Sequence, residues 1–284
     1  MAKRVYIGVG GKARKVKKIY IGVAGVARKV KKAYIGVGGV ARIFWSGGEL
    51  AYYGTATALS SGRTYHAAAT VGNYALFGGG YSYSSGYMTT VDAYSASLIR
   101  STPTALSVAR YKLAAAAVGN YALFIGGYYY DGEDRMSSTR IDVYNTSLTR
   151  STMTADQDCF GNAAASVGNY ILYVKNNVAG SVVATINASL TKGTAASLST
   201  ARYDLAAMTL GDFALFGGGC TSSSSRSAVV DSYDTSLTMT VATSLSLARE
   251  YPQGIQVGDY GLFAGGNNGS SSGSYSAVVD VYTI

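Results

Sequence analysis

The sequence predicts an all-β fold: a β-propeller of five blades, preceded by a short basic segment of β-hairpins. A hydrophobic strand motif occurs five times at a spacing near 47 residues, four times with a glycine pair at its end, and the same neighbouring strand patterns accompany it. A repeat of about 40–50 residues with four short strands is typical of propeller blades. The composition agrees, because 36 Gly and 25 Tyr with only 2 Pro favour short strands and tight turns.

The strand motif reads Val-Gly-Asn-Tyr-Ala-Leu-Phe-Gly-Gly in its first copy, at residues 71–79. An Ala-rich strand precedes it, a polar loop follows it, and an alternating strand and a Thr-rich strand complete the unit. The aromatic anchors of the copies lie at spacings of 47, 49, 43 and 47 residues, and they are Tyr74, Tyr121, Tyr170, Phe213 and Tyr260. The unit therefore contains four short strands.

The two ends of the propeller sequence predict how the ring closes. The chain ends at Ile284, after the third strand of the fifth unit. The segment Tyr52–Leu59 aligns with the fourth strand of the first unit, Ile99–Leu106, but stands ahead of that unit. We therefore expect this N-terminal strand to complete the fifth blade, because closure removes an open sheet edge.

The repeat of residues 50–284 resembles the Kelch family. Three features carry the resemblance: the hydrophobic strand that ends in Gly-Gly, the Tyr about fifteen residues later, and the Arg before the first strand. The repeat departs from the family in having no Trp near the last strand of any unit. Kelch proteins imply a ring of about six or seven blades, so the count of five rests on this sequence.

Residues 1–47 form a separate segment with a period of 14 residues, and the propeller domain is expected to span 48–284. Tyr6, Tyr20 and Tyr34 each begin a Tyr-Ile-Gly-Val strand, followed by two small residues and a basic strand. Small pairs of this kind suit two-residue hairpin turns. A ribbon this thin cannot bury a core, so these tyrosines and Trp45 are expected to pack in assembly, against another copy, another protein or the propeller.

The positive charge is confined to the N-terminal segment. Residues 1–45 hold 12 of the 24 Lys and Arg and no acid, which leaves 12 basic residues against 15 acids and a net charge of −3 for residues 46–284. Nucleic acid is therefore not an expected partner of the propeller. For the basic segment, a polyanion partner and a solvated ribbon remain alternatives to assembly. No apolar stretch approaches the length of a membrane span, and no signal-peptide pattern is visible.

Two repeat positions carry Arg and Asp together in four of the five units. The pairs are Arg63 with Asp92, Arg110 with Asp142, Arg202 with Asp231, and Arg249 with Asp280. The third unit has Cys159 and Ala184 instead, so both are lost together. Joint loss favours a structural ion pair with bidentate geometry. In the alternative, the four Arg face the central channel and attract an anion, although unpaired buried Arg is costly.

The loops after the glycine pairs differ in length and content, so we expect ligand contacts there. The candidate residues are Tyr81, Tyr83, Tyr87, Tyr128, Tyr129, Tyr130, Asp131, Asn267 and Asn268. Tyr combines an apolar face with a polar tip, which suits sugar rings and protein surfaces. Solvated filler loops are the alternative. The acidic run that begins at Asp131 is expected to be a solvated loop, because it lacks the spacing of a calcium loop.

We expect no catalysis, no metal and no cofactor. His66 is the only His, and the two Cys have no metal-ligand spacing. The glycine-rich turns open no helix, so they are not phosphate loops. A glycan-acting enzyme with paired carboxylates stays open as an alternative.

The pattern Tyr-Ile-Gly-Val-Gly-Gly, with its following Ala-Arg-Lys-Val-Lys-Lys, is similar to segments at the head of bacteriophage and prophage virion proteins. The resemblance implies a multi-copy virion protein of the tail-fibre or head-fibre type, made in the host cytoplasm without a signal peptide. Residues 1–47 would attach to other virion proteins, and the propeller would bind a host-surface glycan or protein. Many copies would strengthen weak single sites. The alternative is a capsid or tail decoration protein with no receptor.

Overall fold

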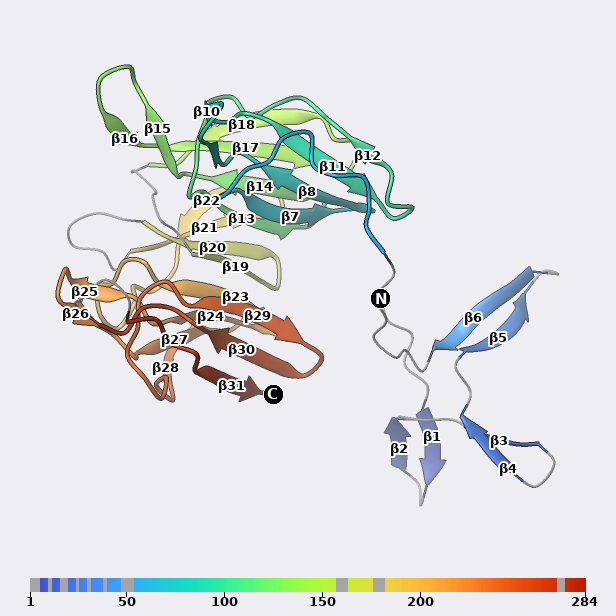
Figure 1. The fold of residues 1–284 in the computed structure, drawn as a ribbon. Helices are drawn as coiled ribbons and strands as arrows, with labels where there is room; N and C mark the ends of the chain where they lie inside the picture. The colour runs from blue at the N-terminus through green and yellow to red at the C-terminus, as the bar shows by residue number, and fades with distance from the viewer. Residues whose placement is uncertain are drawn as a thin grey trace. The chain divides into compact units, whose positions relative to one another are not determined.

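The computed structural model describes residues 6–9, 12–15, 20–23, 26–29, 32–37, 40–46, 54–156, 163–175, 182–269 and 274–284. The chain separates into two compact units, Met1–Thr55 and Ala56–Ile284 (Figure 1). Every regular element in the described ranges is a β-strand. These ranges accordingly contain no helix long and apolar enough to cross a membrane.

The N-terminal unit contains three antiparallel two-stranded hairpins. They are β1 (Tyr6–Val9) with β2 (Lys12–Lys15), β3 (Tyr20–Val23) with β4 (Val26–Lys29), and β5 (Lys32–Val37) with β6 (Val40–Ser46). Tyr6 pairs with Lys15 and Tyr20 with Lys29, so the 14-residue period recurs in the register. The third hairpin has a bulge between Ala33 and Tyr34. The packing expected of Tyr6, Tyr20, Tyr34 and Trp45 concerns side chains that lie outside the description.

The second unit consists of five small antiparallel sheets arranged in a ring, as in a five-bladed propeller. Blade 1 contains β7 (Ala67–Val71), β8 (Tyr74–Gly78), β11 (Val91–Ser95) and β12 (Arg100–Ser101). Blade 2 contains β13 (Ala114–Val118), β14 (Tyr121–Ile125), β17 (Arg140–Asn145) and β18 (Arg150–Thr154). Blade 3 contains β19 (Ala164–Val167), β20 (Tyr170–Val174), β21 (Val183–Asn187) and β22 (Lys192–Thr194).

Blades 4 and 5 continue the same order of strands. Blade 4 contains β23 (Ala206–Leu210), β24 (Phe213–Gly217), β27 (Val230–Tyr233) and β28 (Met239–Ala242). Blade 5 contains β29 (Gln253–Val257), β30 (Tyr260–Ala264) and β31 (Val279–Thr283). Short hairpins extend from blades 1, 2 and 4: β9 (Tyr81–Ser82) with β10 (Gly86–Tyr87), β15 (Tyr128–Tyr130) with β16 (Arg135–Ser137), and β25 (Cys220–Ser222) with β26 (Ser225–Arg226).

Tight turns join the first two strands of each blade. Val71 pairs with Tyr74 in blade 1 and Val118 with Tyr121 in blade 2, so two residues make each turn. The first turn residue is a glycine at positive φ, for example Gly72 at 54°. A glycine at this position suits the hairpin turns that match the twist of the strands.

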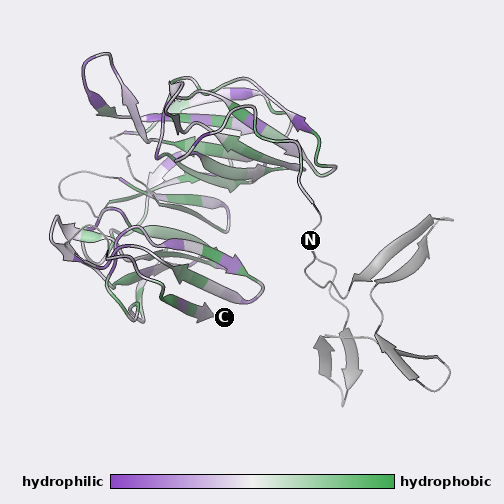
Figure 2. Ribbon diagram, in the orientation of Figure 1, coloured by the Kyte–Doolittle hydropathy of each residue, from purple (hydrophilic) through white to green (hydrophobic). Residues whose placement is uncertain are grey.

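The hydrophobic core lies between neighbouring blades, whose strands carry many apolar residues (green in Figure 2). Leu76 and Ala93 of blade 1 pack in one cluster with Phe124 and Tyr144 of blade 2. Phe124 and Tyr144 form an edge-on ring pair with centroids 5.8 Å apart, and the same pair recurs in blades 1, 4 and 5. The alternating strands thus supply one apolar face to each neighbour.

The predicted N-terminal closing strand stays a prediction, because the residues that align with β12 of blade 1 begin at Tyr53, outside the described residues. Ala56–Leu59 belongs to no strand, and β31 pairs only with β30. This segment makes the same contact at blade 1 that the aligned segment makes at blade 2: the Tyr94 hydroxyl donates to the Thr57 carbonyl at 2.6 Å, as Tyr144 does to Thr104 at 2.7 Å. Arg100 also donates to the Ala58 carbonyl at 3.0 Å. The remainder of the expected strand, including Tyr52, lies outside the described residues.

Blade 5 therefore leaves exposed a face that the other blades bury. Val281 is 58% exposed, whereas Val143, at the equivalent position of blade 2, is 1% exposed. On the other side of the same seam, the face of blade 1 that corresponds to the Phe124 face of blade 2 is only partly covered. Phe77 is half-buried there, while its counterpart Phe124 is completely buried. The seam between blades 5 and 1 is thus the loosest part of the ring.

Candidate functional site

The repeated Arg and Asp residues form four ion pairs inside the blades. Arg63 meets Asp92 at 2.6 Å and Arg249 meets Asp280 at 2.7 Å, and the same contact joins Arg110 to Asp142 and Arg202 to Asp231. All four Arg side chains are 0% exposed. The geometry is not the predicted bidentate fork, because a single guanidinium nitrogen meets the carboxylate in each pair.

The other guanidinium nitrogen binds carbonyl groups at the base of the neighbouring loop. In blade 2, Arg110 donates to the Gly126 carbonyl at 2.5 Å and to the Arg140 carbonyl at 2.7 Å. In blade 4, Arg202 donates in the same way to Gly218 at 2.7 Å and to Val229 at 2.6 Å. In blades 2 and 4, both terminal guanidinium nitrogens are therefore used within the blade, so Arg110 and Arg202 are not available to an anion in the central channel. In blade 5, Arg249 donates to the Leu247 carbonyl at 3.1 Å instead, and in blade 1 the second terminal nitrogen of Arg63 is buried without a hydrogen-bond partner among the described residues.

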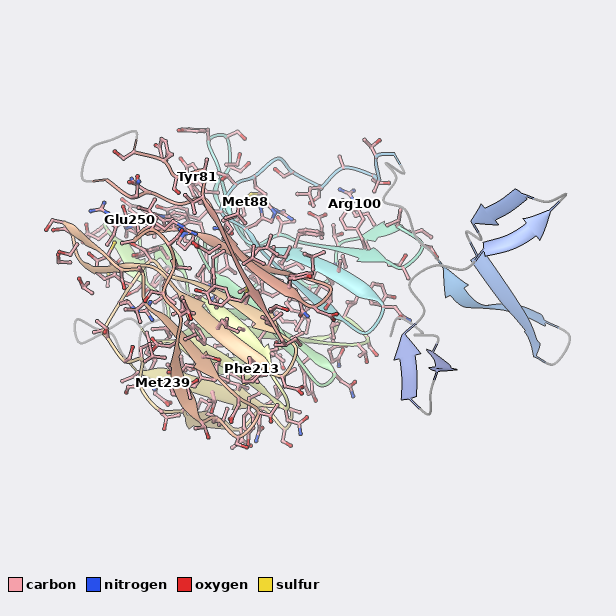
Figure 3. The ribbon with its side chains drawn as sticks, turned by 90° about the horizontal axis from the view of Figure 1, so that it is seen from below. Tyr81, Met88, Arg100, Phe213, Met239 and Glu250 are labelled. Atoms are coloured by element: carbon pink, nitrogen blue, oxygen red, sulfur yellow. The ribbon has the colours of Figure 1, made fainter. Side chains whose placement is uncertain are left out.

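Tyrosines from blades 1 and 2 form one continuous surface over the loop hairpins. The rings of Tyr87 and Tyr111 stack with centroids 4.9 Å apart and planes 6° from parallel. Tyr81, which opens β9 and is labelled in Figure 3, contacts both of these rings at 5.6 and 6.3 Å. We call this set the tyrosine surface, and its members are Tyr65, Tyr81, Tyr83, Tyr87, Tyr111, Tyr128 and Tyr130.

Some rings of the tyrosine surface are held by neighbouring side chains, and others are exposed to solvent. Arg135 lies over the Tyr128 ring, 4.7 Å from its centroid, and donates to the Tyr111 hydroxyl at 3.4 Å. Tyr83, by contrast, is 98% exposed. Burial raises the pKa of Tyr87 and of Tyr128, so both stay neutral hydrogen-bonding groups at physiological pH. Rings fixed at the base and open at the edge can stack against a ligand at little entropic cost.

Sequence reasoning missed two members of this surface, Tyr65 and Tyr111. Tyr111 follows the repeated Arg110 directly, and its backbone bridges to Tyr128. The equivalent bridges in the other blades join Thr64 to Tyr81, Tyr203 to Cys220, and Glu250 to Asn267. A signal for Tyr111 was present in the sequence: the residue after the repeated Arg differs from blade to blade, whereas the Arg itself is kept in four blades.

A second cluster lies where the innermost strands begin. The residue two places after each repeated Arg has a positive φ: 56° at Tyr65, 51° at Lys112, 54° at Asp204 and 52° at Tyr251. Such backbone is strained for residues other than Gly and is found preferentially at functional sites. We call these four residues the channel-mouth cluster.

The side chains of the channel-mouth cluster converge. The Lys112 ammonium lies 5.5 Å from the centroid of the Tyr65 ring and 5.4 Å from that of Tyr251. The Tyr251 hydroxyl hydrogen-bonds to Asp204, and burial raises the pKa of that carboxyl group. The next residues, among them His66 and Leu113, line a central cavity of about 360 Å³. Tyr65 also contacts Tyr111 at 6.0 Å, which joins this cluster to the tyrosine surface.

Three predicted loop residues have local structural roles. The Asp131 carboxylate accepts from the backbone N–H groups of Glu133 and Asp134 at 2.9 and 2.8 Å, and these bonds lower its pKa. In blade 5, the Asn267 side chain accepts from the Gly269 N–H at 2.9 Å, and the Asn268 N–H donates to the Ser274 carbonyl at 3.0 Å. These groups shape loops, and the structure does not bring Asn267 or Asn268 into the tyrosine contacts.

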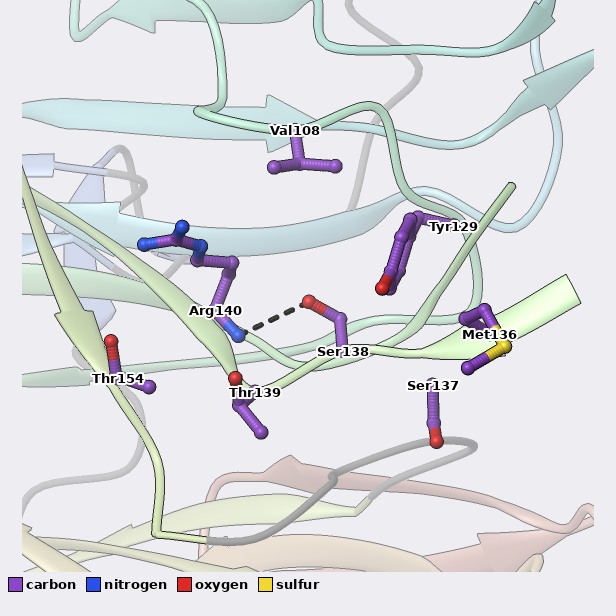
Figure 4. A pocket seen from close by; sticks show the side chains of 8 residues that line it. All are labelled: Val108, Tyr129, Met136, Ser137, Ser138, Thr139, Arg140 and Thr154. Atoms are coloured by element: carbon purple, nitrogen blue, oxygen red, sulfur yellow. Dashed lines mark hydrogen bonds between the residues drawn. The ribbon is translucent and has the colours of Figure 1, made fainter. Parts of the chain in front are cut away.

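The Tyr129 side chain lies at a different site from those of its sequence neighbours Tyr128 and Tyr130. It lines a pocket of about 480 Å³ on blade 2, together with Met136 and Arg140 (Figure 4). Side chains alternate between the faces of a strand, so Tyr129 points away from the side on which Tyr128 and Tyr130 meet the tyrosine surface. The candidate tyrosines thus serve two sites.

Cys220 is expected to be unreactive in the folded protein. Burial raises the pKa of its thiol to about 12, and the Glu250 carboxylate, which accepts from Sγ at 2.7 Å, adds to the shift. At pH 8 only about one thiol in ten thousand would be ionised, and the thiolate is the reactive form. Iodoacetamide labelling followed by peptide mapping should therefore modify Cys220 rapidly only in urea. Glu250→Gln should speed labelling of the folded protein, and fast labelling of the native thiol would contradict this account.

The described residues contain no group of three or more His, Cys, Asp and Glu side chains that could hold a metal ion. His66 is half-buried beside Phe77, and its pKa is lowered by burial and by Arg63. No protein-family model matches the chain, and no curated protein matches it. The geometry of the sites therefore carries the functional argument.

Proposed function

We propose that this protein is an adhesive component of a virus particle, built on a Kelch-like propeller, and that its tyrosine surface binds a glycan on the host cell. The observation that carries the proposal is the continuous set of tyrosine rings on blades 1 and 2. The stacked pair Tyr87 and Tyr111 holds the centre, and the exposed Tyr83 ring lies at the edge.

The chemistry of this surface suits a carbohydrate. The C–H faces of a sugar pack on aromatic rings, and the phenolic hydroxyls can exchange hydrogen bonds with sugar hydroxyls. Exposed aromatic clusters are uncommon on proteins that bind nothing, because they leave apolar area in water. The neighbouring hairpins β9–β10 and β15–β16 hold the rings in place, so little order must be gained on binding.

Residues 1–47 would attach the propeller to the particle. Three two-stranded hairpins in series support this part of the proposal, because such hairpins are marginal unless a partner covers them. Display in many copies would convert a weak single contact into firm attachment.

The test is binding of the full-length protein to an array of immobilised bacterial surface polysaccharides, followed by titration of the best ligand. Tyr87→Ala should weaken binding about tenfold, which corresponds to about 1.4 kcal/mol, because it removes half of the stacked pair. Tyr275→Ala is the matched control: Tyr275 is an exposed tyrosine of blade 5 with no ring partner among the described residues, and its loss should leave affinity unchanged. Equal affinity of Tyr87→Ala and wild type, or no glycan bound above background, would refute the proposal.

A further inference from the structure

Blade 2 carries a pocket on the opposite side of hairpin β15–β16 from the tyrosine surface. Its volume of about 480 Å³ lies within the range of small-ligand sites, roughly 300–1,000 Å³. One wall is formed by Tyr129 and Met136, which pair across the hairpin, and Val108 and Arg140 form another (Figure 4). Hydroxyl groups complete the lining, and they come from Ser137, Ser138, Thr139 and Thr154.

Two of these residues are peculiar to blade 2. The position of Tyr129 is occupied in other blades by Ser82, Thr221 and Asn268. The position of Arg140 is occupied by Thr90, Val182, Val229 and Val278. The repeat therefore needs neither a large ring nor a cation at these places, yet blade 2 has both, and both line the same pocket.

The fold uses the backbone of Arg140 but not its side chain. The Arg140 carbonyl accepts from Arg110, and the Val229 carbonyl accepts from Arg202 in the same way in blade 4. The Arg140 N–H donates to Ser138 Oγ at 3.1 Å. Within the described part of the chain, the guanidinium has no hydrogen bond or ion pair, and Figure 4 shows it in the space below Val108. An exposed cation with free donors, on a wall opposite an aromatic ring, is poised to meet an anionic group.

We infer that this pocket holds a carboxylate-bearing sugar unit of an acidic glycan. The inference rests on the proposed glycan-binding function and names the class of sugar. The planar guanidinium of Arg140 matches the two oxygens of a carboxylate. The Tyr129 ring offers a face for the sugar C–H groups, and Thr139 and Thr154 can bind its hydroxyls. The carboxylate provides selectivity, and the ring provides affinity that does not depend on charge.

The test is titration of the full-length protein with glucuronate and, as the neutral match, with the methyl ester of glucuronic acid, followed by NMR of the sugar. Wild type should prefer glucuronate to the ester by about tenfold. Arg140→Val installs the residue of blades 3, 4 and 5, so it should keep the melting temperature and abolish the preference. Tyr129→Ser installs the residue of blade 1 and should weaken both sugars equally.

Each result has a separate meaning. Unchanged glucuronate preference in Arg140→Val would overturn the inference. Stronger, Arg140-dependent binding of an acetylated diglutamate peptide than of glucuronate would overturn it in favour of an acidic peptide ligand. Tyr87→Ala distinguishes this inference from the broader proposal, because it should weaken polysaccharide binding but leave the glucuronate titration unchanged. If Tyr87→Ala has no effect on either while Arg140→Val loses glucuronate, the tyrosine surface fails and the pocket stands.

Discussion

Replacing Arg110 by alanine is expected to lower the free energy of unfolding by about 3–5 kcal/mol. The guanidinium is completely buried and satisfies Asp142 and the carbonyls of Gly126 and Arg140. Its removal leaves two buried carbonyls without their donor and takes the buried cation from Asp142, although Arg150 at 3.2 Å and the Ser107 N–H at 2.9 Å still donate to that carboxylate. Urea denaturation of the full-length protein, followed by near-UV circular dichroism, measures the change.

The third blade supplies the control for this prediction. It has Cys159 and Ala184 at the two positions, so the repeat tolerates the loss of both partners. The double variant Arg110→Cys/Asp142→Ala should therefore be more stable than the single variant Arg110→Cys. If the double variant is the less stable one by the sum of two single losses, the two side chains do not act as a pair.

A series of phenylalanine substitutions should reveal the loose seam of the ring. Phe124, Phe216 and Phe263 occupy one repeat position between blades and are 0% exposed, so Phe→Ala at each should cost about 3–5 kcal/mol. Phe77 occupies the same position in blade 1, but the face of blade 5 does not cover it, and Phe77→Ala should cost roughly half as much. Denaturation midpoints of the four variants, measured side by side, give the comparison.

The substitutions in this series are chemically identical, so their differences report packing alone. A Phe77→Ala cost equal to that of Phe124→Ala would show that blades 5 and 1 pack together in solution. The same outcome would support the prediction that residues ahead of the first unit complete blade 5. Val143→Ala and Val281→Ala provide a second matched pair across the same seam, because one side chain is buried and the other is exposed.

The parts of the fold that repeat were predictable from the sequence, because every blade places the same types of residue at the same strand positions. The spacing of Tyr74 and its counterparts places the second strand of every blade, and the joint loss of Arg and Asp in one unit indicates their pairing. The closing strand is a different case, because it would join β31 to Tyr52–Leu59 from the opposite end of the propeller sequence. In the other four blades the third and fourth strands pair as neighbours in sequence.

The sites depend on the residues that break the repeat, and alignment of the units alone does not show where these meet. Tyr111 and Lys112 follow a repeated Arg, yet their partners include residues of other blades. Arg140 looks like an ordinary strand residue in the sequence. Only the fold shows that its side chain has no structural role and that it lies across a pocket from Tyr129. The loop tyrosines were identified from the sequence, but their division between two sites was not.

Arg110 hydrogen-bonds to both ends of the loop between Gly126 and Arg140, and this affects how the loop sequences of such a protein can evolve. These two hydrogen bonds fix where the loop leaves the sheet and where it returns, whatever the sequence between these points. Arg202 holds Gly218 and Val229 in the same manner. The sequence and length of each hairpin can thus vary while its two anchoring points on the blade stay the same. New recognition specificities can be acquired by replacing the hairpin, while the register and stability of the blade stay as they were.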